Sequence, residues 1–452
     1  MTAPAAPVHA SADLAAASPP RRLTQWTGAA AVVGVVIGSG IFRVPTGVAQ
    51  LAPEPLAILA LWLFGGLLAL CLAMLLAEAG TMFPRAGGMY VYLREAWGEG
   101  AAFVYGFTFL LVNPASWATL ATASAEYLGY FLQLDDPQRR GLAMALILAL
   151  SLVNALSARL GALLQNLTTS AKVLALVAVI ALVGANTGSH VGGFGVAPPT
   201  LPPLAGMLLA LVAVLWAYDG SSTFCALAGE VRDPQRAIPR ALLGGLGLVT
   251  LIYVAMNAVL LLALPVERIA ATPLALTEAV GDSLGSAAPA LIAALVAIAT
   301  LGSLAGCVLA DPRVFFAMGR DRNFVARAGR LHPATLTPVN AIALHALIAC
   351  LYVSVRSFEQ LAATFVLGLV PFYALAAAGV WRLRRLRPDQ PRPFRAPWVP
   401  ALALLWIVVA ALLVGNALLE TPRIALVNVV ITALGVPAWF AWRRFRPAEN
   451  SR

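Results

Sequence analysis

Apolar residues dominate this chain in long runs, each about 20 residues and bounded by charged residues, Pro or Gly. Runs of this length are typical of helices that cross a bilayer, whereas barrel strands alternate in short segments. We expect an all-α membrane protein with 12 transmembrane helices. They are predicted at about 26–50, 56–82, 98–132, 140–157, 161–186, 204–230, 239–264, 288–318, 338–355, 359–383, 398–419 and 424–442. The third run is long enough to tilt or to kink at Asn113-Pro114.

Composition supports this class of protein. The chain has 452 residues, of which 60% are hydrophobic and 11% charged, and its mean hydropathy is +0.85. Soluble domains carry about 25% charged residues. The first 20 residues are rich in Ala, Pro and Ser and have no apolar segment of the kind found in a signal peptide. We therefore predict a disordered cytoplasmic tail over 1–22 and a second cytoplasmic tail over 444–452.

The net charge of +10 is explained by topology. With both termini inside the cell, the segments predicted to be cytoplasmic hold 23 arginines and the outer segments hold six. This bias satisfies the positive-inside rule and removes the reason to invoke a nucleic-acid partner. We expect a multi-pass plasma membrane protein, in the inner membrane of a bacterium, with both termini cytoplasmic.

The chemistry of a catalytic or metal site is missing from the sequence. The four cysteines all lie in apolar runs, the four histidines are scattered, and neither residue type shows the spacing of metal ligands. We find no zinc-protease or nucleotide-binding motif. The sequence predicts no enzyme activity, no metal and no cofactor.

The first apolar run contains an unusual cluster of small residues. Gly38 and Gly40 flank Ser39 at about the middle of the run, and Pro45 follows. One interpretation is close helix–helix packing through small residues. The other is a break in the helix, where unpaired N–H and C=O groups face a substrate.

The sixth run carries a second interruption, which favours the broken-helix interpretation. Asp219 and Gly220 follow Trp216-Ala217-Tyr218 in the middle of an apolar stretch, and three hydroxyl residues come next. An acid at that depth needs partners. Interruptions at corresponding positions of two five-helix halves are typical of inverted-repeat transporters, with the substrate bound between them.

Lys172 is the only lysine, and it lies a turn or two inside the fifth run. A charge buried there without a partner costs several kcal/mol, so an intramembrane lysine suggests a function. The alternative is a side chain that extends to the cytoplasmic surface. We favour a function because lysine, unlike arginine, can lose its proton when it is desolvated.

Several ordered motifs between about Gly34 and Ile348 resemble the amino acid–polyamine–organocation (APC) superfamily, and within it the L-type amino acid transporter branch. The motifs are Gly38–Phe42 with Pro45, Glu78–Tyr90, Asn154–Lys172, Ala217–Gly220, Gly229–Pro234, Ile238–Ala241, Pro312-Arg313, Ala317–Asp321 and Thr337-Pro338. The resemblance implies a LeuT-type fold with discontinuous helices 1 and 6. Its inverted repeats would occupy 23–186 (helices 1–5) and 204–384 (helices 6–10), with helices 11 and 12 over 397–443.

The resemblance also implies a substrate site at the two breaks. Its residues are Val36, Ile37, Gly38, Ser39, Gly40, Ile41, Trp216, Ala217, Tyr218, Asp219 and Gly220. The free amides of Gly38, Ser39 and Gly40 would bind the substrate carboxylate, since N–H groups at a helix N-terminus favour anions. The carbonyls of Val36, Trp216 and Asp219 would bind the α-ammonium.

The chain departs from the family pattern at three places. Trp216 stands where L-type members often carry Phe, at a position that resembles a lid over the substrate, which favours small substrates. Ser221-Ser222 follow Gly220 where many members have Trp. Asp311-Pro312 in the eighth run is polar for its depth, and the sequence suggests only a kink and a carboxyl that faces the site.

Lys172 and two loop charges complete the predicted machinery. The lysine matches one found in sodium-independent members, where its ammonium would bond to carbonyls of the broken helix 1. Loss of its proton would release that helix, which makes Lys172 the predicted coupling residue. Glu230 is a predicted gating residue, paired with Arg232 or Arg85, although exposed ion pairs contribute only about 0–1 kcal/mol.

The sequence thus predicts a sodium-independent secondary transporter of small neutral L-amino acids. It leaves open whether the protein works by proton symport or by amino acid exchange. The alternatives are an amino-acid sensor or assembly subunit that does not transport, and a carrier of polyamines or cationic amino acids. The expected partners are an amino acid, possible coupling protons and the lipid bilayer, with no partner subunit evident.

Overall fold

The computed structural model describes residues 21, 23–186, 202–272, 275–355 and 358–445. Within these residues every regular element is a helix, apart from one isolated parallel bridge between Leu23 and Val231. Nearly all of the predicted tails (1–22 and 444–452) lies outside the described residues. The last helix continues through Phe445, two residues into the second predicted tail, and the bounds of both tails stay predictions.

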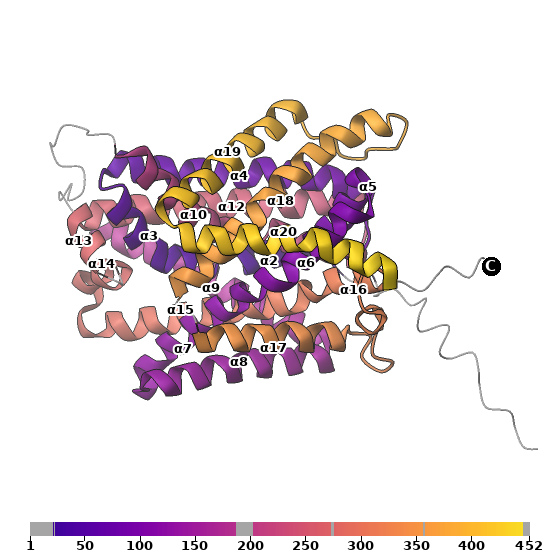
Figure 1. The fold of residues 1–452 in the computed structure, drawn as a ribbon. Coiled ribbons are helices and arrows are strands. Elements are labelled where there is room, and N and C mark those ends of the chain that lie inside the picture. The colour runs from indigo at the N-terminus through magenta and orange to yellow at the C-terminus, as the bar shows by residue number, and fades with distance from the viewer. Residues whose placement is uncertain (1–20, 22, 187–201, 273–274, 356–357, 446–452) are drawn as a thin grey trace, which may run out of the picture.

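Long apolar helices form the body of the molecule (Figure 1). They are α4 (Pro55–Met82), α6 (Glu99–Val112), α7 (Pro114–Leu132), α8 (Asp136–Leu156), α9 (Ala158–Asn186), α10 (Leu204–Tyr218), α12 (Pro234–Ala263), α15 (Ala288–Ala310), α17 (Val339–Val355), α18 (Phe358–Leu386), α19 (Val399–Glu420) and α20 (Pro422–Phe445). The first predicted span is divided into α2 (Gln25–Val36) and α3 (Gly40–Leu51).

The number of spans agrees with the prediction only in part. Among the described residues, ten helices are long and apolar enough to cross a membrane, and the bent pair α2–α3 raises the number to 11. α17 has 17 residues, which corresponds to a length of only about 25 Å. The count of 12 spans therefore stays a prediction, and so does the relation of the two halves as inverted repeats.

Short helices connect or extend the long ones. They are α5 (Met89–Trp97), α11 (Ser221–Ala226), α13 (Val266–Ala271), α14 (Ala275–Leu284), α16 (Pro312–Arg320) and the 3-10 turns η1 (Ala228–Glu230), η2 (Gly285–Ala287) and η3 (Ala326–Gly329). Those at 221–226, 228–230 and 312–320 lie wholly or mostly in predicted runs, the first as the second part of the discontinuous helix 6, and the others were not predicted. The search for runs of bilayer length could not find elements this short. The expected kink at Asn113-Pro114 is present, because α6 ends at Val112 and α7 begins at Pro114.

The interrupted helices lie inside the bundle. α2 packs against α9, α12 and α15, while α10 packs against α3, α4 and α18. α8 and α17 lie side by side along one edge of the molecule, and α19 and α20 contact each other and α18 (Figure 1). The two breaks are therefore shielded from the surface by other helices.

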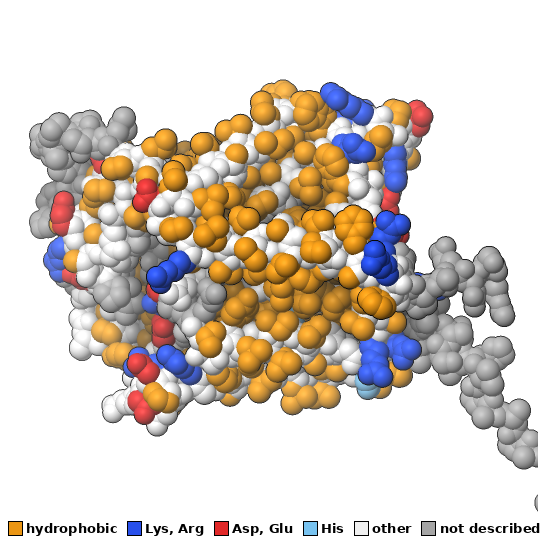
Figure 2. All heavy atoms as spheres, viewed as in Figure 1, with side chains coloured by type: hydrophobic (Ala, Val, Ile, Leu, Met, Phe, Trp, Pro, Cys, Tyr) orange, Lys and Arg blue, Asp and Glu red, His pale blue; other side chains and the backbone are white. Residues whose placement is uncertain are grey.

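The surface matches that of a membrane protein. Figure 2 shows hydrophobic side chains over the middle of one face and charged side chains towards its two ends. We call the end where α5 and α16 lie the basic end (Figure 1), and Arg85, Arg94 and Arg320 line one pocket there. The end with Arg43 and Glu359 is called the opposite end. By the positive-inside rule the basic end is predicted to face the cytoplasm.

Candidate functional site

The first helix is interrupted where the small residues predicted a break. α2 ends at Val36 and α3 begins at Gly40, with a bend of 43° between them. The Gly38 N–H donates to the Val36 carbonyl at 2.8 Å, a local closure that ends the helix. Within the described part of the chain, the amides of Ser39, Gly40 and Ile41 donate to no backbone carbonyl. These amides at the N-terminus of α3 are suited to a carboxylate.

The sixth helix is interrupted at Asp219 and Gly220, between α10 and α11. Gly220 has a φ of +153°, which glycine tolerates and other residues rarely adopt. A Cβ on Gly220 would lie 2.5 Å from the Val36 side chain, and one on Gly40 would lie 2.6 Å from the Ala217 Cα. The two breaks therefore touch, and glycine at both positions permits that contact.

A small cavity lies between the two breaks. It encloses about 30 Å³ and is lined by Val35, Val36, Gly38, Ser39, Gly40, Ser116, Leu120, Trp216, Asp219, Thr223, Cys307 and Phe365. Six of the predicted site residues line it. The other five, which are Ile37, Ile41, Ala217, Tyr218 and Gly220, are buried next to it.

Other helices supply lining residues that the sequence analysis missed. Ser116 and Leu120 come from α7, Cys307 from α15 and Phe365 from α18. Ser116 and Cys307 are visible in the sequence as small polar residues within apolar runs. Their orientation toward the breaks depends on how the helices pack.

The carbonyl groups at the breaks are not equally available. The Val36 carbonyl accepts from the Tyr253 hydroxyl at 3.0 Å as well as from the Gly38 amide. Because a carbonyl oxygen has two lone pairs, the Val36 carbonyl is fully engaged in this structure, and its expected role in binding an ammonium stays a prediction. The Trp216 carbonyl accepts one bond, from the Asp219 amide at 3.3 Å. The Asp219 carbonyl receives no hydrogen bond from any described residue.

Lys172 reaches the break from α9. Its side chain is fully buried, and its Nζ donates to the carbonyls of Gly34 and Ile37, both at 2.6 Å. Further contacts join Nζ to the Ala299 carbonyl at 3.2 Å and to the Ser303 Oγ at 3.1 Å. The contact with helix-1 carbonyls agrees with the sequence-based expectation, and the side chain does not extend to the surface.

Trp216 separates the cavity from a vestibule at the opposite end. Its ring packs edge-on against Phe365, with centroids 5.3 Å apart. The vestibule encloses about 330 Å³, and its lining includes Trp216, Arg43 and Glu359. Because Trp216 lines both spaces, its ring occupies the position of a lid.

Asp219 is tied to α18 through its side chain. The Tyr373 hydroxyl donates to its carboxylate, and the Ser222 Oγ lies 3.4 Å from the same hydroxyl. Asp219 thus joins the second break to the neighbouring helix while its carboxyl lines the cavity.

Ion pairs cross the basic end, with partners that differ from those we expected. Glu230 lies 2.8 Å from the Nε of Arg313, so its expected pairing with Arg232 or Arg85 is wrong. Arg85 pairs instead with Glu95 at 2.6 Å. Arg313 follows a buried helix break 83 residues further along the chain, and sequence proximity favoured the loop arginines over it.

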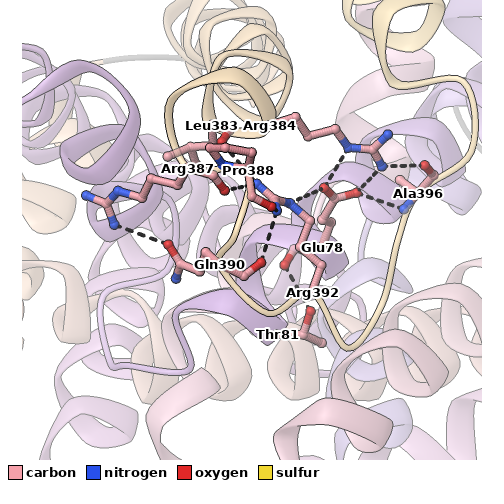
Figure 3. Close-up of polar contacts among 9 residues, drawn as sticks. All are labelled: Glu78, Thr81, Leu383, Arg384, Arg387, Pro388, Gln390, Arg392 and Ala396. Carbon is pink, nitrogen blue, oxygen red and sulfur yellow. Dashed lines mark hydrogen bonds and ion pairs between the residues drawn. The ribbon is translucent and has the colours of Figure 1, made fainter.

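Glu78, at the end of α4, is a fully buried carboxylate that forms ion pairs at this end (Figure 3). Arg384 donates to both of its carboxylate oxygens, at 2.9 and 2.6 Å, and the Ala396 amide donates at 2.8 Å. The Nε of Arg392 lies 3.6 Å from the Oε1 of Glu78. This cluster fastens the loop between α18 and α19 to α4.

Comparisons with known proteins were made for the whole chain. A family model described as amino acid permease matches residues 23–439. The chain is 28% identical over 417 residues to the serine/threonine exchanger SteT of Bacillus subtilis (strain 168), covering 91% of this chain and 94% of the relative.

Two human proteins show similar likeness. Identity to the b(0,+)-type amino acid transporter 1 of Homo sapiens is 31% over 410 residues, with 88% of this chain and 82% of the relative covered. Identity to the human cystine/glutamate transporter is 28% over 438 residues, with coverage of 93% and 85%.

Proposed function

This chain belongs to the amino acid permease family, and on that premise we propose that it is a sodium-independent secondary transporter of small neutral L-amino acids. The observation that carries the proposal is the contact between two broken helices around one small cavity. Unpaired amides border the cavity on one side and a free carbonyl on the other.

The head group of an amino acid fits these groups. We assign the substrate carboxylate to the amides of Ser39, Gly40 and Ile41, at the positive end of the α3 dipole. We assign the α-ammonium to the carbonyls of Asp219 and Trp216, where α10 ends. Both charges of the zwitterion are then bound by backbone groups that every α-amino acid can use.

The small size of the cavity supports the proposal that the substrate has a small side chain. It encloses only about 30 Å³ below the Trp216 ring. The space for the substrate side chain has apolar walls, which are formed by the Trp216 lid, Phe365 and Leu120. The name of one relative, a serine/threonine exchanger, is in keeping with this assignment.

We assign coupling to Lys172 and gating to the Glu230–Arg313 ion pair at the basic end. Four acceptors hold the Lys172 ammonium between α2, α9 and α15. Loss of its proton or displacement of its Nζ would weaken the hold on α2. The Glu230–Arg313 pair joins η1 to α16 and would have to separate if the basic end opened toward the cytoplasm, whereas the Arg85–Glu95 pair holds the nearby α4–α5 connection in place.

Purified protein in liposomes tests the proposal. Uptake of labelled Ala, Ser, Thr and Leu is measured with and without internal amino acid, with and without a pH gradient, and with Lys, Arg and a polyamine in the panel. We expect saturable uptake of small neutral amino acids without sodium. Binding without flux would favour a sensor or assembly subunit, and uptake restricted to Lys, Arg or the polyamine would favour a cationic carrier.

A further inference from the structure

Asp311 is a buried carboxyl that the proposed head-group site does not use. It lies between α15 and α16, and its side chain is fully buried. The Trp117 indole N–H donates to its Oδ2 at 2.8 Å. Its Oδ1 is buried and accepts no hydrogen bond from the described residues. An ionised carboxylate in such a place, with only the neutral Trp117 indole and the nearby Thr223 hydroxyl as donors, is several kcal/mol less stable than in water.

The nearby cations are engaged elsewhere. Arg313, two residues along the chain, is paired with Glu230 at 2.8 Å. The Lys172 ammonium is surrounded by the helix-1 carbonyls, the Ala299 carbonyl and Ser303. Neither cation is hydrogen-bonded to Asp311 in the structure.

A second carboxyl lies within electrostatic range of the first. Asp219 interacts with Asp311 through charge, and its own hydrogen bond comes from the Tyr373 hydroxyl. The buried interior around the cavity thus holds one lysine and two carboxyls. A neutral amino acid is a zwitterion and adds no net charge. One negative charge therefore stays uncompensated while the site is closed.

α15 places Asp311 next to the cavity and to Lys172. Ser303, Cys307 and Asp311 follow one another at four-residue intervals, which puts them along one side of the helix. Ser303 contacts Lys172, and Cys307 lines the cavity. Asp311 is the next position toward the basic end, beside the cavity-lining Thr223.

Other titratable side chains around Asp311 come from several helices. They are Asp219, Tyr105, Cys307 and Arg313, with Tyr373 beside Asp219 and Cys225 beside Tyr105, and His345 packs against the Trp117 ring with centroids 4.5 Å apart. The tyrosines and cysteines are neutral near pH 7, and Arg313 has its own partner. Of these groups, the two carboxyls are the ones whose buried negative charge is removed when a proton binds.

We propose that Asp311 is the proton-binding carboxyl of a symport cycle. When the site is open to the opposite end, water reaches Asp311 and a proton from the medium adds to a carboxylate oxygen. The closed site then carries amino acid and proton together with no uncompensated charge. After the basic end opens, the proton leaves to water and the carboxylate forms again. This inference rests on the proposed function and specifies its coupling ion.

A cationic substrate is the competing way to supply the missing charge. A lysine or arginine side chain would bring its own positive charge near Asp219 and Asp311. The cavity of about 30 Å³ beneath the Trp216 ring favours a proton, since it has no room for a long side chain. The two cases are separated by whether protons move with the substrate.

The experiment follows protons and amino acids in the same liposomes. Full-length protein is reconstituted with a pH-sensitive dye inside, and internal acidification is recorded when external alanine is added at equal internal and external pH. Exchange of labelled alanine for internal alanine is measured in parallel. The variants are Asp311→Asn, which imitates the protonated carboxyl, and Asp136→Asn, a control whose side chain is 86% exposed at the start of α8.

We expect the wild type and Asp136→Asn to acidify the interior, and Asp311→Asn to exchange alanine without acidification. Acidification by Asp311→Asn equal to that of the wild type would overturn the proposal. So would alanine exchange by the wild type without proton movement, or uptake of lysine in preference to alanine. If the wild type moves no amino acid at all, the proposed function itself fails.

A second variant covers the case in which Asp311→Asn neither exchanges nor acidifies. Asp311→Glu keeps the carboxyl, and we expect it to restore alanine uptake with acidification. Loss of exchange in both variants, with gel-filtration profiles like that of the wild type, would show that Asp311 acts in packing or substrate binding and would overturn the proposal.

Discussion

The Nζ of Lys172 lies 2.6 Å from the carbonyl oxygen of Ile37, where the first helix is interrupted. A helix interruption leaves carbonyls without intrahelical donors, and a buried ammonium needs acceptors. Each group thus satisfies the other in the interior. The contact also fastens α2 to α9, so this part of the first helix cannot separate from α9 while the ammonium stays in place.

Lys172→Ala is expected to reduce amino acid uptake by at least about tenfold while the protein still folds. A loss of about 1.4 kcal/mol in the stability of the closed state would be enough for that factor, and hydrogen bonds to charged groups contribute about 1.5–3 kcal/mol. Uptake into liposomes and gel filtration measure the two effects. Lys172→Met, which keeps an unbranched side chain one atom shorter and without charge, should be as defective. Uptake at the wild-type rate in either variant would show that the ammonium has no coupling role.

Trp216→Phe is expected to widen the range of substrates. Phe is also aromatic, so the lid would still pack against Phe365. Because its ring is smaller than that of Trp, it would leave more room above the cavity. We predict that leucine uptake rises relative to alanine uptake by about 10-fold, the scale for a change in apolar fit of roughly 1–3 kcal/mol. Competition by unlabelled leucine against labelled alanine measures this ratio. An unchanged ratio would argue against Trp216 as the lid.

Glu230→Gln is expected to make the basic end open more readily, because the variant weakens the contact with Arg313. Cys307 lines the cavity and can report this through a membrane-impermeant thiol reagent, in a background where the other three cysteines are replaced by Ala. Labelling of Cys307 from the basic end should be faster in Glu230→Gln. The control is Asp389→Asn, an exposed residue of the same end. Equal rates of Cys307 labelling in Glu230→Gln and Asp389→Asn would show that Glu230 does not act as a gating residue.

The ion pairs of Glu95 are expected to make the free energy of unfolding depend on pH. Burial raises the pKa of its carboxyl, but hydrogen bonds from Arg85 and Arg387 outweigh that effect and the pKa lies below its usual value. A lowered folded-state pKa stabilises the protein above the unfolded-state pKa of about 4.3, and this stabilisation is lost as the pH falls through the folded-state value. Because both arginines are exposed, we expect about 1 kcal/mol or less.

Glu95→Gln tests this expectation through apparent melting temperatures in detergent. The variant should melt below the wild type at pH 7, and the difference should shrink as the pH falls below about 4. A difference that is the same at both pH values would mean that the charge of Glu95 does not contribute.

The sequence predicted features that depend on local chemistry. Gly38, Ser39 and Gly40 weaken a helix wherever it lies, and the break at α2–α3 follows from them. A lone lysine in an apolar run needs acceptors, and the carbonyls left free by that break are the nearest unsatisfied groups.

Contacts between distant elements could not be predicted in this way. The Tyr253 hydroxyl donates a hydrogen bond to the Val36 carbonyl, and Glu230 pairs with Arg313 rather than with Arg232. Both outcomes depend on which sides of the helices face each other. A helix that is apolar nearly all round has no hydrophobic periodicity that would identify its facing side. Asp311 was recognised as polar for its depth, but its partner Trp117 lies almost 200 residues away.

The central claim, that an amino acid binds at the break in the first helix and is transported, depends on Gly40. Its Cα faces the Ala217 backbone so closely that a Cβ would lie 2.6 Å away, and its amide is one of the free donors. Gly415, on α19, has open space around an added Cβ. Saturable uptake of labelled alanine is therefore compared between wild type, Gly40→Leu and Gly415→Leu in liposomes. We predict uptake by the wild type and by Gly415→Leu and none by Gly40→Leu; equal uptake by all three proteins would contradict the site, and no uptake of any amino acid by the wild type would contradict the function.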